Sequence, residues 1–92
     1  MSVSAYTNSG GVHPYEGLTA SGAYTREGVA ACGPSYAFGT LFFVPSLGRW
    51  FVCQDRGGAI TDANLDLWFA SEDEALEWGR QGLEVIIVPV SK

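Results

Sequence analysis

The sequence has few cationic residues, one histidine, two cysteines and no long apolar segment. Lysines and arginines together number five against ten acidic residues, so the formal net charge is −5. This balance argues against binding to the phosphates of nucleic acids and against anchoring to anionic lipid. His13 and the two cysteines are too scattered to match a zinc-binding pattern. No apolar run reaches the roughly 18 residues that a transmembrane helix requires.

The composition instead predicts a single small globular domain that occupies residues 1–92. Hydrophobic residues make up 47% of the chain and charged residues 16%, which is typical of an ordered globular domain. Twelve glycines and four prolines interrupt the chain often, so we expect short strands joined by tight turns. The sequence contains no internal repeat, low-complexity tract or linker that would divide the domain.

Local patterns predict six strands and one helix. The strands are expected at residues 3–7, 29–32, 40–44, 49–54, 64–69 and 83–90, with the third and fourth forming a hairpin. Ser71 and Glu74 match a capping box, so the helix should begin at Ser71 and end at Gly82. Leu76 is expected on the packing face of this helix. The continuous apolar run at 83–90 predicts a buried final strand.

The segment 64–69 carries the first candidate for chemistry. Apolar residues alternate along it with other types, which is the period of a half-buried strand. Asp66 and Trp68 therefore share the face that points away from the core. A carboxyl group beside an indole loses hydration, which raises its pKa, as a general acid working near neutral pH requires. Trp68 is alternatively a flat platform for a sugar ring.

A second acidic residue precedes a pair of glycines. Asp55 is followed closely by Gly57 and Gly58, which permit a sharp turn or the close approach of another group. Such a turn would fold Asp55 back towards Asp66. The pattern leaves a second interpretation open, in which Asp55 only forms a turn and Asp66 is a solvated strand residue.

The two cysteines lie near the ends of two expected strands. A disulfide between Cys32 and Cys53 would close a loop of about 20 residues and stabilise the fold by about 3 kcal/mol in the chain-entropy model. A domain this small would benefit from such a bond in an oxidising compartment. Two buried free thiols are the alternative. We favour the disulfide.

Several motifs in one order resemble the three-aspartate ("3D") domain family. The strongest is Asp-Arg-Gly-Gly-Ala-Ile at 55–60, followed by Leu-Asp-Leu-Trp-Phe at 65–69; further similarities lie at 5–7, 18–22, 39–40 and 74–80. The family includes stationary-phase survival proteins and the catalytic barrel of membrane-bound lytic transglycosylase A. This chain departs from the family pattern at Cys32, which stands where the first of the three aspartates is usual.

The resemblance implies an all-β domain, a six-stranded double-psi β-barrel with one short helix before the last strand. Asp66 matches the catalytic acid/base of the family, and Asp55 matches its supporting carboxylate. The substrate-binding candidates are Tyr15, Thr19, Gly57, Gly58 and Trp68. Of these, Thr19 is expected to line the cleft by resemblance, whereas Tyr15 either stacks on sugar or caps the barrel.

The reaction that the resemblance implies is lytic transglycosylation of peptidoglycan. One carboxyl group protonates the glycosidic oxygen between N-acetylmuramic acid and N-acetylglucosamine. It then removes the proton from the muramic C6 hydroxyl, which gives a 1,6-anhydro product without a metal or cofactor. Two alternatives stay open. The domain is either a non-catalytic module that binds glycan strands, or a hydrolase that uses Asp55 and Asp66 as acid and base.

The resemblance also implies an extracytoplasmic location, secreted or associated with the cell wall. Residues 1–4 lead directly into an expected strand and do not form a signal peptide. These two points agree if the domain is excised from a longer secreted protein or if a phage supplies another export route, and we favour an excised domain. We expect a monomer whose partner is peptidoglycan glycan strands.

Overall fold

The computed structural model describes residues 1–7, 19, 21–22, 26–57, 59–70 and 72–90. Along these residues seven strands and one helix follow one another in this order: β1 (Ser2–Tyr6), β2 (Val29–Cys32), β3 (Leu41–Val44), β4 (Arg49–Asp55), β5 (Asn64–Trp68), α1 (Glu72–Trp78), β6 (Gln81–Gly82) and β7 (Ile86–Val88). The expectation of an all-β domain with one short helix is confirmed for this part of the chain.

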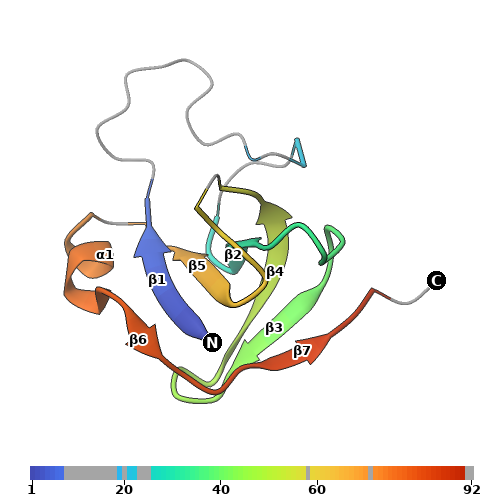
Figure 1. The fold of residues 1–92 in the computed structure, drawn as a ribbon. Coiled ribbons are helices and arrows are strands. Elements are labelled where there is room, and N and C mark those ends of the chain that lie inside the picture. Colours follow the sequence, from blue (N-terminus) through green and yellow to red (C-terminus); the bar gives the residue numbers. More distant parts are fainter. Residues whose placement is uncertain (8–18, 20, 23–25, 58, 71, 91–92) are drawn as a thin grey trace.

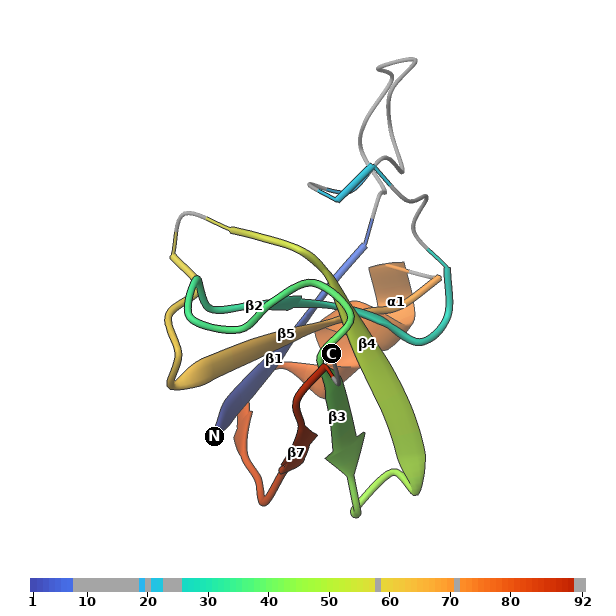
Figure 2. The ribbon, with the colours of Figure 1, turned by 90° about the vertical axis from the view of Figure 1, so that its right-hand side faces the viewer.

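The seven strands form one sheet, which curls into a half-barrel (Figures 1 and 2). The strand order is β6-β1-β5-β2-β4-β3-β7. β1 pairs in parallel with β5, and β2 pairs in parallel with β4, whereas β2 and β5 are antiparallel. β6 and β7 lie at opposite ends of this order, although only residues 83–85 separate them in the chain. The C-terminal segment thus passes from one edge of the sheet to the other (Figure 1).

The predicted hairpin between the third and fourth expected strands is confirmed by β3 and β4. Val44 pairs with Arg49, and the turn between them is closed by the Gly48 N–H, which donates to the Val44 carbonyl at 2.9 Å. Phe42 and Phe51 face each other across this hairpin and are 0% and 1% exposed. Because successive side chains of a strand point to opposite faces of the sheet, these two rings point into the core and the residues next to them point outward.

The core is built from inward-facing side chains of most of the strands. Val3 of β1 and both Leu65 and Leu67 of β5 are 0% exposed, as the period-two pattern predicts. Phe69 extends this core beneath the helix, where its ring lies 5.8 Å from that of Trp78. Burying each large apolar side chain stabilises the fold by roughly 1.5–3 kcal/mol. Position 66 is therefore fixed by the buried leucines on either side of it.

The helix is shorter than the sequence predicts. It ends at Trp78, and Gly79 follows with φ 63°, a left-handed conformation that commonly closes a helix; the predicted end at Gly82 is wrong. Trp78 packs against the core and donates its indole N–H to the Val3 carbonyl at 3.2 Å. Leu76 points away and is 71% exposed, so its predicted packing role is also wrong. The predicted cap Ser71 lies outside the described residues.

The C-terminal strands differ from the prediction in number and burial. The prediction had six strands with the helix before the last one, whereas the described residues form seven, and two of these follow the helix. β6 has only two residues, too few to show an alternating pattern. β7 is an edge strand, and Ile86, Ile87 and Val88 are 49%, 36% and 40% exposed rather than buried. Across the described residues, no helix has the length and hydropathy needed to cross a bilayer.

Candidate functional site

The two acidic residues singled out from sequence lie on strands on either side of β2. Ala31 of β2 pairs with Asp55 of β4 on one side and with Asp66 of β5 on the other. A register shift between Ala30 and Ala31 produces this alignment, because it brings the end of β4 level with the middle of β5. The fold therefore places the two carboxylates in one row across three strands.

Tyr6 links this row to the first strand. Its hydroxyl donates to Asp55 Oδ2 at 3.1 Å. Burial raises the pKa of Tyr6, and the negative charges of Asp55 and then Asp66 raise that pKa further. The phenol is consequently held in its protonated, hydrogen-bond-donating form. Both carboxylates thus lie near enough to this hydroxyl group to raise its pKa.

Asp66 is positioned by Ser4, its partner across the parallel pairing of β1 and β5. The Ser4 hydroxyl donates to Asp66 Oδ1 at 3.0 Å. Burial raises the pKa of Asp66 above its usual range, and the charge of Asp55 adds to this effect. The Ser4 hydrogen bond and the positive charge of Arg80 oppose the rise without cancelling it. The raised pKa of Asp66 agrees with the direction expected from the sequence.

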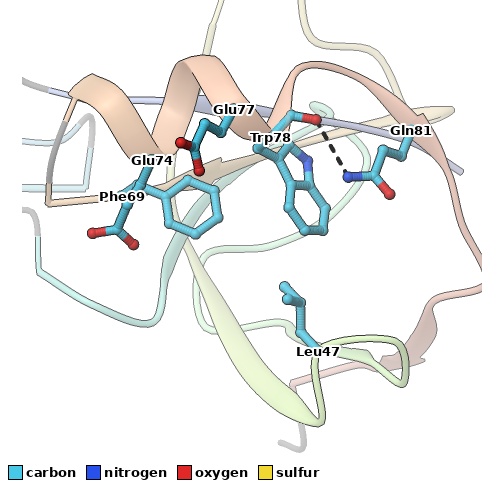
Figure 3. A pocket seen from close by; sticks show the side chains of 6 residues that line it. All are labelled: Leu47, Phe69, Glu74, Glu77, Trp78 and Gln81. Carbon is cyan, nitrogen blue, oxygen red and sulfur yellow. Dashed lines mark hydrogen bonds between the residues drawn. The ribbon is translucent and has the colours of Figure 1, made fainter.

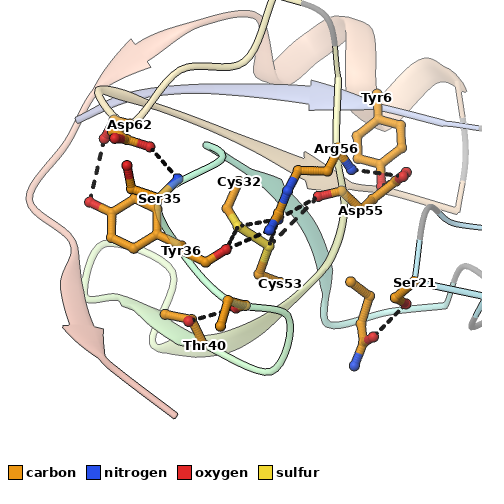
Figure 4. The surroundings of a disulfide bond; sticks show 12 residues. Tyr6, Ser21, Cys32, Ser35, Tyr36, Thr40, Cys53, Asp55, Arg56 and Asp62 are labelled. Atoms are coloured by element: carbon orange, nitrogen blue, oxygen red, sulfur yellow. Dashed lines mark hydrogen bonds between the residues drawn. A yellow bond between two sulfur atoms is a disulfide. The ribbon is translucent and has the colours of Figure 1, made fainter.

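A disulfide anchors the strand that carries Asp55. Cys32 of β2 and Cys53 of β4 are bonded, with their Cα atoms 5.7 Å apart, which confirms the expected pair. Arg56 covers the bond, because its Nη1 lies 3.0 Å from Cys32 Sγ and 3.1 Å from Cys53 Sγ (Figure 4). Such a bond is consistent with an oxidising, extracytoplasmic compartment.

Arg56 also fixes the residue that precedes it. Its backbone N–H donates to Asp55 Oδ1 at 2.9 Å, while its guanidinium donates to the Tyr36 carbonyl and lies 4.1 Å above the Phe38 ring. The Asp55 carboxylate is thus held on one oxygen by Tyr6 and on the other by the backbone of Arg56 (Figure 4). The main contacts of this guanidinium are thus the disulfide, a backbone carbonyl and an aromatic ring.

Two further predicted substrate-binding residues, Thr19 and Trp68, are both largely buried. Thr19 is 6% exposed and shares a hydrogen bond of 3.0 Å with Ser21, whose hydroxyl donates to Gln54 Oε1 at 2.6 Å. This places Thr19 beside the end of β4 that carries Asp55. Trp68 is 9% exposed, which leaves little indole surface for a sugar ring.

The glycine motif forms a turn at this site. The Ile60 N–H donates to the Gly57 carbonyl at 3.0 Å, and a Cβ at position 57 would lie 2.9 Å from Ile60 Cγ1. Gly57 is exposed and is suited to this tight turn. Gly58 and Tyr15 lie outside the described residues, so their expected contacts with substrate stay predictions.

Asp62 has a structural role that the sequence pattern did not indicate. Its Oδ1 accepts the Ser35 N–H at 3.1 Å, and its carbonyl accepts the Tyr36 hydroxyl at 3.4 Å. Hydrogen bonds from Ser35 hold the pKa of Asp62 below its usual range. A Cβ at Gly33 would collide with Asp62, so a glycine is required there. The hydrogen bonds of Asp62 thus connect the loop after β2 to the loop before β5.

Neither carboxylate of the row lines the hollows that the described residues form beside α1 and beside β4. The hollow beside α1 has a volume of about 290 Å³ and lies between Leu47 on one side and Phe69 and Trp78 on the other (Figure 3). Glu74, Glu77 and Gln81 form its rim. This hollow is separate from the Asp55–Asp66 row.

A comparison with known protein families shows to which family the chain belongs. The family profile described as the 3D domain matches residues 29–89, which is more than half of the chain. The chain belongs to the 3D domain family. The match includes Asp55, Asp66 and both cysteines of the 3D domain, whereas β1, with Ser4 and Tyr6, precedes it. A comparison with curated proteins finds no match.

Ser4 and Tyr6 were not predicted as site residues. Alternation along β1 places them on the same face, opposite to Val3, and this was the one signal available. Nothing in the local sequence indicates that β1 pairs in parallel with β5, which lies about sixty residues later in the chain. The pairing brings Ser4 to Asp66, and the course of β1 brings Tyr6 to Asp55.

Proposed function

We propose that this 3D domain is a lytic transglycosylase-like domain that cleaves peptidoglycan glycan strands with Asp66 as its acid/base. The observation that carries the proposal is the row in which Asp55 and Asp66 flank Ala31 and act together on the Tyr6 hydroxyl. Family membership supports peptidoglycan as the substrate class, because related barrels act on that polymer.

The proposed reaction begins with the proton on Asp66. Because burial raises the pKa of this carboxyl group, it holds a proton more readily than a solvated aspartate does. It donates this proton to the glycosidic oxygen as the bond from that oxygen to muramic C1 breaks, which leaves an oxocarbenium-like centre. The departing N-acetylglucosamine end keeps the proton as a hydroxyl group.

The second half of the reaction regenerates the acid. The Asp66 carboxylate removes the proton from the muramic C6 hydroxyl, and O6 bonds to C1 to close the 1,6-anhydro ring. No water is consumed, so the cycle needs one acid/base group rather than two. Ser4 keeps the Asp66 carboxyl group in a fixed orientation through its hydrogen bond.

Asp55 has a supporting role in this proposal. Tyr6 and the backbone N–H of Arg56 each donate to one of its oxygens, which fixes the direction of the side chain. A fixed negative charge near the reacting C1 would stabilise the positive charge that develops there. The disulfide strengthens this arrangement, because it joins β2 to β4 two residues before Asp55.

A non-catalytic glycan-binding module is the second candidate. It is favoured by Cys32, which stands where the family usually has its first aspartate and is committed to the disulfide. In either case we propose that the curled sheet closes as a double-psi β-barrel and that the domain works as a monomer outside the cytoplasm. The link that residues 81–88 make between the two sheet edges supports closure.

The test is mass spectrometry of purified peptidoglycan digested with the domain. We expect 1,6-anhydro-muropeptides from the wild type and none from Asp66→Asn, which keeps the side-chain shape but cannot transfer the proton. Asp73→Asn is the matched control, because Asp73 is an exposed carboxylate on α1, and it should retain full activity. Products from Asp66→Asn at the wild-type rate would contradict the proposal. Binding without products in the wild type would favour the binding module.

A further inference from the structure

Trp50 presents the largest exposed indole surface in the described part of the chain. It is 51% exposed, whereas Trp68 is 9% exposed and Trp78 is partly buried against the core. Trp50 points outward from β4, where Phe43 of β3 is its cross-strand partner. The two rings are 4.9 Å apart and tilted by 48°, so Phe43 supports the indole from one side. The other part of the indole faces solvent on a rigid strand.

A hollow of about 310 Å³ lies beside this indole. Arg26, Glu27 and Gly28 form one wall, and Leu41, Trp50 and Val52 form the other. The volume is at the lower end of the range for small-molecule pockets, about 300–1,000 Å³, which suits one ring rather than a large ligand.

The turn that forms the first wall is fastened to the sheet. The Val52 N–H donates to the Gly28 carbonyl at 2.7 Å, and the Val29 N–H closes the turn by donating to the Arg26 carbonyl at 3.1 Å. Gly28 has φ 94°, a conformation that favours glycine. The hollow is therefore formed before any ligand arrives, which limits the entropy lost on binding.

The charges around the hollow favour a neutral ligand with several hydroxyl groups. Arg26 and Glu27 line it with opposite charges, and Arg49 lies 4.0 Å from Glu27, so neither sign of ligand charge is preferred. Planar guanidinium and carboxylate groups can donate to and accept from neighbouring hydroxyls at the ring edge. The indole and Leu41 offer an apolar surface to the C–H face of the same ring.

We propose that this hollow is a second saccharide subsite, in which a pyranose ring of the glycan stacks on Trp50. The choice of glycan rests on the proposed function, but the subsite does not depend on the acid/base chemistry of Asp66. Trp50 and Asp55 are five residues apart on β4, which corresponds to about 17 Å along a strand. The two sites are thus separate, and Trp50 takes the platform role that the sequence assigned to Trp68.

The experiment titrates the domain with tri-N-acetylchitotriose and follows tryptophan fluorescence. We expect the emission of the wild type to shift as the exposed indole is covered. Trp50→Ala should weaken binding about tenfold or more, equivalent to about 1.4 kcal/mol, and Trp50→Phe should restore part of the affinity. Leu76→Ala is the matched control, because Leu76 is an exposed apolar residue on α1 that does not line this hollow. This variant should bind as the wild type does.

Three further measurements separate this proposal from its rivals. In NMR spectra of the wild type, the trisaccharide should shift the Trp50 indole N–H and the amides of residues 26–28. Asp66→Asn should keep this binding while losing cleavage, which separates failure of the subsite from failure of the proposed function. An unshifted wild-type spectrum would overturn the subsite whether or not the domain cleaves glycan. Dimers in sedimentation analysis that Trp50→Ala dissociates would overturn it as well, because the apolar face would then join two copies.

Discussion

Reduction of the disulfide is expected to cost this domain a large part of its stability. Cys32 and Cys53 are separated by 21 positions, so the bond closes a loop slightly longer than the 15-residue case, for which the chain-entropy model gives about 3 kcal/mol. The free energy of unfolding of a domain of this size is itself roughly 5–14 kcal/mol. The loss is thus between about a fifth and more than half of the total.

The effect should be measured as a change in melting temperature. About 1 kcal/mol shifts the midpoint by roughly 4–8 °C in a domain of 60–100 residues, so reduction should lower it by roughly 12–24 °C. Calorimetry with and without a phosphine reductant measures this shift. The Cys32→Ser/Cys53→Ser double variant is the control, and it should melt at a lower temperature that the reductant does not change.

The reasoning also predicts where the reduced protein is weakened. The bond joins β2 to β4 beside the row that carries Asp55 and Asp66, so hydrogen exchange should accelerate first in these two strands. A melting temperature that reductant leaves unchanged, in a sample shown by thiol labelling to be fully reduced, would refute the stabilising role of the bond.

Three further predictions follow from the site and its loops. Folding raises the pKa of Asp66, so the folded protein binds the Asp66 proton more tightly than the unfolded chain does. The ionised carboxylate therefore lowers the free energy of unfolding at neutral pH. This destabilisation disappears as the pH falls through the pKa of the folded state and Asp66 becomes protonated. Asp66→Asn should therefore raise the melting temperature at neutral pH and have a smaller effect in acid; equal shifts at both pH values would contradict this. Tyr6→Phe removes a hydrogen bond to Asp55 and should cost about 1 kcal/mol in urea unfolding and reduce cleavage; unchanged values for both would remove Tyr6 from the site. Gly33→Ala should destabilise by about 1–3 kcal/mol, because the added methyl group collides with Asp62; wild-type stability in the same urea assay would contradict the close packing.

Sequence patterns were informative about the fold where the signal was periodic and local. Alternation identified β5, and two apolar runs around a short turn identified the β3–β4 hairpin. The same reasoning fails at the C-terminus, where the apolar run at 83–90 predicts a buried strand. Hydrophobicity alone does not show that β7 lies at the edge of the sheet, which depends on the order of all the other strands.

The site was predictable where resemblance supplied residue roles, and less so where long-range pairing decides them. Asp55 and Asp66 are both candidates from the sequence, but their alignment through Ala31 depends on a register shift that no local pattern encodes. Ser4 and Tyr6 were missed because β1 pairs in parallel with a distant strand. Alternation predicts that Trp68 points away from the core. It does not show that other parts of the protein bury the Trp68 side chain, whereas the Trp50 side chain remains exposed to solvent.

The central claim is that Asp66 transfers one proton out and back without involving water, and isotope labelling tests it most directly. Peptidoglycan is digested in water enriched in heavy oxygen, and the released ends are weighed by mass spectrometry. The account predicts 1,6-anhydro ends that carry no heavy oxygen, and no such ends from Asp66→Asn. Reducing ends that contain heavy oxygen from the solvent would show hydrolysis and would contradict it.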